Sequence, residues 1–264
     1  MQRKKSGWKK LLLLFLALLL LFQVGDLIRL RYFDSARHLP VLMYHHFDLE
    51  CPDGTVVTPG RFREQMERDG ALPDNPVLIT MDDGYTSNLT VAAPILEELG
   101  MCATVFVIGV YEGEVRNPNN GWKISIPRFS YQEALPWVDK GVLDLQSHSF
   151  NMHLLVADGF SERDGMLSMD GESRDAYRQA LLDDAEQARL RREEDGVPGE
   201  LCALAFPFGY YDTGLDGVLA EAGYAVTFTI DERLNRLTPG DTACLRMLGR
   251  INVTDHVSGE TLVK

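Results

Sequence analysis

Two short stretches of the sequence carry residue types that can do chemistry. The first, VLITMDDGY at residues 77–85, is an apolar run that ends in two adjacent carboxylates, Asp82 and Asp83. The second, QSHSFNMH, carries His148 and His153. Adjacent carboxylates repel each other and resist burial unless a cation or a proton is close to them. The end of the first stretch therefore indicates a site.

Read alone, each stretch also fits ordinary structure. VLITMDDGY fits a strand followed by an Asp-Gly turn, and His148 and His153 fit two unrelated loop residues. Positions five apart do not share one face of a helix or a strand. The two imidazoles can therefore meet only if the chain bends directly after a strand that ends near His148.

Taken together, the two stretches fit a metal site. Two imidazoles and one carboxylate supply three ligands, which is typical of a catalytic Zn²⁺ or a similar divalent ion with one position open for water. A second carboxylate beside the cation stays ionised and can take a proton from water. The Asp pair therefore predicts one metal ligand and one general base.

The elements that must position these residues alternate along the chain. Apolar strand-like runs lie at 40–45, 76–81, 103–109, 142–148, 203–208, 224–230 and 244–253. Helical patterns lie between them at 59–70, 90–100, 130–141, 173–196 and 214–223. Continuous apolar runs that alternate with helices predict an α/β fold, either a barrel or a doubly wound parallel sheet. In both architectures the working groups gather at the carboxyl ends of the strands.

The start of the chain differs from the rest in charge and hydropathy. Residues 1–37 contain eight Lys and Arg residues and two Asp residues around the uncharged run LLLLFLALLLLFQVG, although the whole chain has a formal net charge of −13. This layout predicts a cytoplasmic basic stretch, an uncleaved hydrophobic helix that anchors the protein in the membrane, and a linker. Secretion after signal cleavage is the alternative. The acidic remainder, residues 38–264, argues against nucleic acid as a partner.

With these motifs the sequence resembles the polysaccharide deacetylases, also called NodB-homology or carbohydrate esterase family four domains. The resemblance runs from PVLMYHHF, which starts at Pro40, to GRINV, which ends at Val253, and it includes MDDGY, HSFNMH and FPFGYYD. It implies a distorted (β/α) barrel of about seven strands over residues 38–264. The five-residue spacing of the two His residues resembles the branch that acts on poly-N-acetylglucosamine and related surface polymers.

The resemblance also implies roles for individual residues. Asp82 matches the catalytic base, and the matching metal ligands are Asp83, His148 and His153. The residues expected at the substrate groove or the oxyanion are Tyr85, Pro207, Phe208 and Arg250. Two family positions differ here: the Arg expected four residues before Pro207 is Ala203, and the stretch MLGRINV carries no His as general acid. His45, at another predicted strand end, is the candidate for that proton donor.

The function that the resemblance implies is metal-dependent removal of N-acetyl groups from a cell-surface or cell-wall polysaccharide. Zn²⁺ is the expected ion, with Co²⁺, Ni²⁺ or Mn²⁺ as alternatives, and the protein is expected to be a monomer. One rival function is an O-acetyl esterase of the xylan type, because an ester depends less on a general acid. A second rival is a non-catalytic glycan-binding relative.

Overall fold

A computed structural model describes residues 37–50, 55–69, 76–159, 161–212 and 214–258. The predicted anchor lies outside these residues. Along the described chain, no helix is both long and apolar enough to cross a membrane. The chain divides into two compact units, one made of Leu39–Asn235 with Thr242–Lys264 and the other of Met1–His38 with Arg236–Asp241. The candidate site lies wholly within the first, larger unit.

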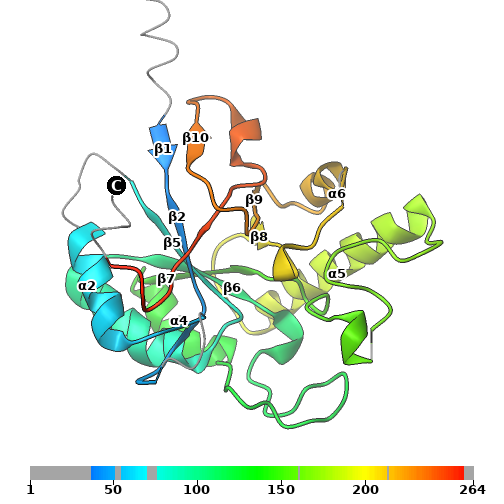
Figure 1. The fold of residues 1–264 in the computed structure, drawn as a ribbon. Coiled ribbons are helices and arrows are strands. Elements are labelled where there is room, and N and C mark those ends of the chain that lie inside the picture. The colour runs from blue at the N-terminus through cyan, green and yellow to red at the C-terminus, as the bar shows by residue number, and fades with distance from the viewer. Residues whose placement is uncertain (1–36, 51–54, 70–75, 160, 213, 259–264) are drawn as a thin grey trace, which may run out of the picture. The chain divides into compact units, whose positions relative to one another are not determined.

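A sheet of seven parallel strands forms the centre of the larger unit (Figure 1). In spatial order its strands are β11 (Ile251–Asn252), β2 (Val41–Tyr44), β5 (Leu78–Asp82), β6 (Ala103–Val107), β7 (Leu143–Ser147), β8 (Ala203–Ala205) and β9 (Val226–Phe228). Each of the seven predicted apolar runs contributes one strand. A parallel bridge between Phe228 and Leu248 links β9 to the segment that leads into β11. The predicted α/β fold, a distorted barrel of seven strands, is confirmed.

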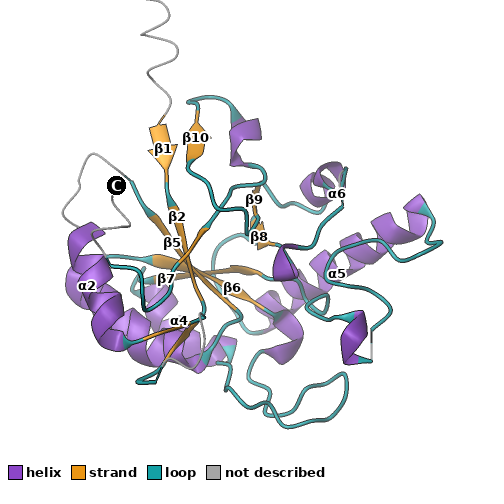
Figure 2. Cartoon of the chain, in the orientation of Figure 1, coloured by secondary structure: helices purple, strands orange, loops and turns teal. Residues whose placement is uncertain are grey.

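Helices connect the strands and lie outside the sheet (Figure 2). The α-helices are α2 (Pro59–Asp69), α3 (Ala93–Leu99), α4 (Tyr131–Asp139), α5 (Arg174–Glu194) and α6 (Asp216–Glu221). The shorter helical turns are η1 (Asn88–Ala92), η2 (Gly109–Tyr111), η3 (Val156–Asp158), η4 (Pro207–Gly209) and η5 (Thr242–Leu245). All five predicted helical stretches are therefore helical. The stretch at 90–100 is the one that differs, because it begins inside the π-helical turn η1 and continues as α3.

The last predicted strand, at 244–253, is much shorter than its apolar run. Only Ile251 and Asn252 join the sheet, and the start of the run forms the 3₁₀ turn η5. The chain passes so close to Asp231 at Gly249 that a Cβ there would lie 2.4 Å from the Asp231 carbonyl oxygen. This close approach leaves the segment before β11 irregular and carries Arg250 into the interior.

Two small sheets complete the described structure. β3 (His46–Phe47) pairs with β4 (Val56–Val57), and β1 (Arg37–Leu39) pairs with β10 (Asn235–Leu237). In the main sheet, Asp82 of β5 is in register with Phe106 of β6, which is itself in register with Gln146 of β7. The carboxyl ends of β5 and β7 therefore finish level with each other, on the two sides of β6. This register brings the segments that follow the two strands to one place.

Candidate metal centre and active site

The end of β5 separates the two adjacent carboxylates. Asp82 is the last strand residue, whereas Asp83 has a φ of 71° and Gly84 a φ of 68°. A positive φ is uncommon for a residue with a Cβ and has to be stabilised by its surroundings. Arg128 supports this turn, because its Nε donates a hydrogen bond of 3.1 Å to the Asp83 carbonyl. The two neighbouring carboxylates consequently meet different partners.

His148 follows β7 directly and is oriented by a backbone group. Its Nδ1 lies 2.8 Å from the carbonyl oxygen of Ala205 in β8. A carbonyl only accepts hydrogen bonds, so Nδ1 carries the proton and Nε2 keeps its lone pair. That Nε2 lies 3.7 Å from Oδ1 of Asp83. Donation of the Nδ1 proton to a backbone carbonyl is typical of His residues that bind a metal through Nε2.

The loop between the two His residues is held by a carboxylate on α5. The oxygens of Asp184 accept hydrogen bonds of 2.8 Å from the backbone N–H groups of Phe150 and Asn151. Burial raises the pKa of Asp184 to about 6, against the opposing effect of these two hydrogen bonds. The chain therefore turns at this point, as the sequence required, and returns His153 to the end of the strand.

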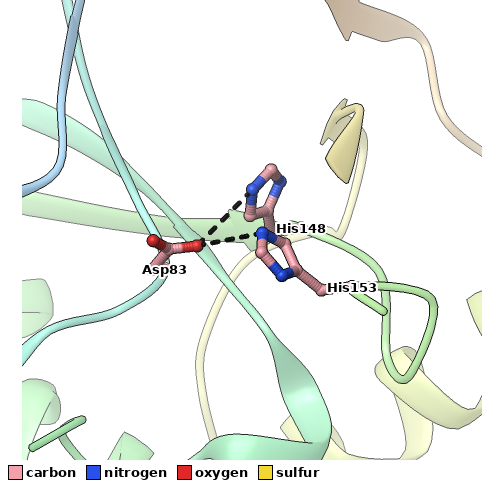
Figure 3. A group of neighbouring side chains, drawn as sticks. All are labelled: Asp83, His148 and His153. Carbon is pink, nitrogen blue, oxygen red and sulfur yellow. Dashed lines mark ion pairs between the residues drawn. The ribbon is translucent and has the colours of Figure 1, made fainter. Parts of the chain in front are cut away.

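Asp83, His148 and His153 converge on one point (Figure 3). One donor atom from each lies within 4.8 Å of the other two. Nε2 of His153 is 3.3 Å from Oδ1 of Asp83, and Nε2 of His148 is 3.7 Å from the same oxygen. Ligands at about 2.0–2.2 Å from a tetrahedral Zn²⁺ are separated from one another by roughly 3.3–3.6 Å. The spacing therefore fits three ligands of a single divalent ion.

The hydrogen bonding and charge of these three residues also fit a cation. Oδ1 of Asp83 is buried without a hydrogen-bond partner among the described residues. Burial opposes the ionisation of Asp83, but His153 and His148 together hold its pKa below the usual value. Burial lowers the pKa of His153 to about 4, against the pull of Asp83. At neutral pH, Asp83 is thus an anion and His153 is uncharged, which are the forms that bind metal.

Asp82 is paired with a buried arginine. Arg250 donates hydrogen bonds of 2.6 and 2.7 Å to the two oxygens of Asp82, and its side chain is 0% exposed. Its Nε also donates to the carbonyl of Thr229 at 3.0 Å. Burial alone would raise the pKa of Asp82, but Arg250, with help from His148, lowers it below the usual value. Asp82 is therefore ionised and held rigidly, with Oδ2 3.9 Å from Nε2 of His148.

A cavity of about 200 Å³ opens above these groups. It is lined by His45, Asp82, Asp83, His148, His153, Phe206, Phe208 and Ile230. Nδ1 of His45 is buried and has no hydrogen-bond partner in the described part of the chain. The His45 backbone is fixed by a hydrogen bond of 2.9 Å from Asn88 to its carbonyl. The cavity thus brings six of the predicted site residues, Phe208 among them, around one small space.

The other predicted site residues lie differently. Pro207 is buried and is not among the residues that line the cavity, and Tyr85 lines a neighbouring pocket. Arg250, expected at the substrate or the oxyanion, is fully buried and contacts Asp82 instead. No Arg stands at Ala203, yet a guanidinium is present beside Asp82 because Arg250 reaches it from the segment before β11.

Phe208 has a backbone that the sequence did not signal. Its φ is 56°, and its ring centroid lies 4.1 Å from that of His153. A positive φ at a residue other than glycine is a mark of functional sites. The following Gly209 also has a positive φ, and a Cβ there would lie 2.4 Å from a carbon of Ile230.

This fold and this cluster together define a class of protein: a parallel α/β barrel with an Asp-His-His set, spaced as the ligands of a divalent ion would be, at the carboxyl ends of its strands. Comparison with known proteins agrees. The family model described as polysaccharide deacetylase matches residues 69–227, which is more than half of the chain. The protein therefore belongs to the polysaccharide deacetylase family.

One curated relative matches a limited part of the chain. It is a protein of Bacillus subtilis (strain 168) named as a polysaccharide deacetylase, YxkH, with 35% identity over 94 residues. The match covers 29% of this chain and 34% of the relative. The chain thus aligns with about a third of the relative's length.

Solved structures match much more of the chain. A de-N-acetylase from Aggregatibacter actinomycetemcomitans matches with a TM-score of 0.69 and 15% identity, covering 86% of this chain and 98% of that one. IcaB from Ammonifex degensii has a TM-score of 0.67 and 19% identity, with coverages of 86% and 95%. The Streptococcus pyogenes deacetylase PplD, solved with acetate, has a TM-score of 0.62 and 18% identity, with coverages of 86% and 97%. At these identities the similarity establishes the fold.

Proposed function

We propose that this protein is a metal-dependent hydrolase that removes N-acetyl groups from N-acetylglucosamine-type units of a cell-surface or cell-wall polysaccharide. The observation that carries the proposal is the convergence of Asp83, His148 and His153 beside an ionised Asp82, in one cavity of about 200 Å³. Two proteins of similar structure, a de-N-acetylase and a deacetylase solved in complex with acetate, support the same reaction class.

Asp83, His148 and His153 would hold the ion, for which Zn²⁺ is the first candidate and Co²⁺, Ni²⁺ or Mn²⁺ are alternatives. When bound, such an ion supplies Lewis acidity, which polarises a carbonyl and makes water easier to deprotonate. The protein's own contribution begins with orientation. The hydrogen bond from Nδ1 of His148 to Ala205 and the loop held by Asp184 fix both imidazoles before substrate arrives.

Asp82 is the proposed general base. Arg250 occupies one lone pair on each of its oxygens, and a carboxylate oxygen has two. The lone pair that remains on Oδ2 can accept a proton from the attacking water. The lowered pKa of Asp82 keeps its carboxylate ionised in mildly acidic and neutral solution. Asp82 is therefore in the form that accepts a proton, although a lowered pKa also makes it a weak base.

His45 and Phe208 complete the proposed reaction. The unpartnered Nδ1 of His45 lines the cavity, and we assign it to protonate the leaving nitrogen. An amine leaves only when it is protonated, so this donor favours amide over ester chemistry. The backbone N–H of Phe208, beside His153, is assigned to stabilise the oxyanion as it forms.

We also propose that the enzyme acts outside the cytoplasm. The support is the basic and apolar layout of residues 1–37, which is typical of a segment that anchors a protein with its positive end inside the cell. The acetylated polysaccharide and the membrane are the expected partners.

The test uses the full-length protein in detergent, treated with chelator and reloaded with one ion at a time. Acetate release is measured from an N-acetylglucosamine oligomer and from acetylated xylan. Asp82→Asn should retain stoichiometric zinc and lose acetate release by about 10²-fold or more. Asp139→Asn, at the exposed end of α4, is the matched control and should behave as the wild type.

Three outcomes would contradict the proposal. Full activity of the Asp82→Asn protein would remove Asp82 as the base. Release from xylan alone would identify an O-acetyl esterase. Stoichiometric zinc with no acetate release from any glycan would favour a binding protein.

A further inference from the structure

A second pocket, of about 300 Å³, lies beside the cavity of the metal centre. The two spaces share His153 and Phe208, so the pocket continues outward from the reacting centre. This volume is at the lower end of the range of about 300–1,000 Å³ for small-molecule sites. The pocket is therefore large enough for one compact unit of a longer ligand.

One wall of the pocket is a structured turn that presents an indole ring. The backbone N–H of Asn117 donates a hydrogen bond of 2.8 Å to the carbonyl of Trp122, and the backbone N–H of Trp122 donates one of 2.9 Å to Oδ1 of Asn120. The Trp122 side chain is nevertheless 70% exposed. A large ring that is held by a fixed backbone and largely exposed is a surface to which an apolar face can bind. The C–H face of a sugar ring is such a face.

The turn is tied directly to the metal-binding loop. Nδ2 of Asn119 donates to Oδ1 of Asn151 at 3.0 Å, and Nδ2 of Asn151 donates to Oδ1 of Asn119 at 3.1 Å. Asn151 lies between the two His ligands and is also held by Asp184. The reciprocal amide pair therefore sets the position of the pocket wall relative to the reacting centre.

The residues that line the pocket include two cations and one acid. Lys123 and Arg128 are the cations, and Asp158 is the acid. Arg128 lies against two tyrosine rings, with its Cζ 4.9 Å from the centroid of Tyr85 and 4.9 Å from that of Tyr111. Among the described residues, neither cation forms a salt bridge. On a chain with a net charge of −13, this local excess of positive charge is unusual.

We propose that this pocket binds the sugar unit next to the N-acetylated unit, and that this neighbouring unit carries an anionic substituent. Trp122 stacks on the ring of the neighbouring unit, and Lys123 with Arg128 binds its anionic group. The inference rests on the proposed deacetylase function. It specifies a substrate in which acetylated and acidic sugar units are adjacent, rather than a uniform neutral polymer.

The test compares two tetrasaccharides as substrates of the full-length, zinc-loaded protein. One is the neutral tetramer of N-acetylglucosamine, and the other alternates N-acetylglucosamine with glucuronic acid. The wild type should release acetate from the acidic tetramer with the higher kcat/KM, and this preference should fall as salt is raised. Lys123→Gln should raise KM for the acidic tetramer about three- to fivefold and leave kcat and the neutral tetramer unchanged.

Trp122→Ala should raise KM for both tetramers without changing zinc content. Two controls should match the wild type: Lys140→Gln, an exposed lysine at the end of α4 that pairs with Glu97, and Val115→Ala, an exposed residue that precedes the turn.

The outcomes separate this inference from the function on which it rests. Equal or better use of the neutral tetramer, or a Lys123→Gln protein with unchanged kinetics, would overturn the acidic neighbour while leaving the deacetylase intact. Unchanged kinetics of Trp122→Ala on both tetramers would overturn the subsite. Release of acetate from neither tetramer by the zinc-loaded wild type would overturn the proposed function, and this inference with it.

Discussion

Replacement of Asp184 by Asn tests how the loop between His148 and His153 is held. Asn is nearly isosteric, but it keeps only one acceptor oxygen for the two backbone N–H groups that Asp184 now binds. One of those groups is left facing an amide NH₂. The substitution therefore removes a charge and one hydrogen bond with little change in shape.

The pH dependence of stability follows from the pKa of Asp184. This pKa is raised from 3.8 to about 6 in the folded protein. Between these values the folded state holds a proton that the unfolded state has released, so the free energy of unfolding falls as pH rises. The contribution is fully present below pH 3.8 and lost above about pH 6. Two pKa units correspond to roughly 3 kcal/mol, and we reduce this to about 1–2 kcal/mol because the side chain is only half-buried.

His153 acts in the opposite direction. Its pKa falls from 6.5 to about 4 on folding, so the unfolded state binds more protons in this range and stability rises with pH. In the metal-free wild type the two slopes oppose each other. Subtracting the curve of Asp184→Asn from that of the wild type cancels the contribution of His153, which both proteins contain, and leaves the contribution of Asp184.

The assay is urea unfolding of the metal-free, full-length protein at pH 4, 5, 6 and 7. Relative to the wild type, Asp184→Asn should become more stable by about 1–2 kcal/mol between pH 4 and pH 7. Its affinity for Zn²⁺ at pH 7.5 should nevertheless fall about tenfold or more, since groups that orient ligands act on that scale. The control is Asp183→Asn, the exposed neighbour on α5. A stability difference that does not change with pH, or unchanged zinc affinity, would refute the reasoning.

Three further substitutions have expected outcomes. Arg250→Met leaves the buried Asp82 unpaired, so it should cost about 3–5 kcal/mol in urea unfolding and move the acidic limb of kcat/KM to higher pH; an unmoved limb would mean that Arg250 does not tune the base. Gly209 has a φ of 70°, and a Cβ there would lie 2.4 Å from a carbon of Ile230. Gly209→Ala should therefore lower the free energy of unfolding by about 1–3 kcal/mol and raise KM, and a wild-type melting temperature would contradict this. His153→Ala should leave zinc substoichiometric after dialysis, and a full complement of zinc would show that another residue takes its place.

The sequence was sufficient for the elements and for the central cluster. Each apolar run contains one strand of the main sheet, and the carboxyl ends of parallel strands share one edge. The bend after His148 could be inferred because His153 cannot otherwise return to the strand end. These inferences need only local pattern and the geometry of parallel sheets.

The groups that support the cluster were not predictable in the same way. Arg250 pairs with Asp82 across 168 positions of the chain, and Asp184 reaches Phe150 across 34. The family resemblance placed Arg250 at the substrate or the oxyanion, but nothing near it in the sequence indicated that it pairs with Asp82. Asp184 lies among the many charges of α5. One signal was present: Ala203 stands where the family has an Arg, so a buried carboxylate at Asp82 required a cation from another segment.

The adjacent carboxylates of MDDGY can now be explained by the backbone between them. Asp82 is extended at the end of β5, and Asp83 turns into the left-handed region. Asp82 is therefore neutralised from one side by a permanent cation, Arg250. Asp83 faces two imidazoles and keeps a buried oxygen without a hydrogen bond. An extended backbone at both positions would point the two side chains to opposite faces of the sheet, so the strained turn at Asp83 is what allows a carboxylate paired with Arg250 and a carboxylate with an unpaired oxygen to share one cavity.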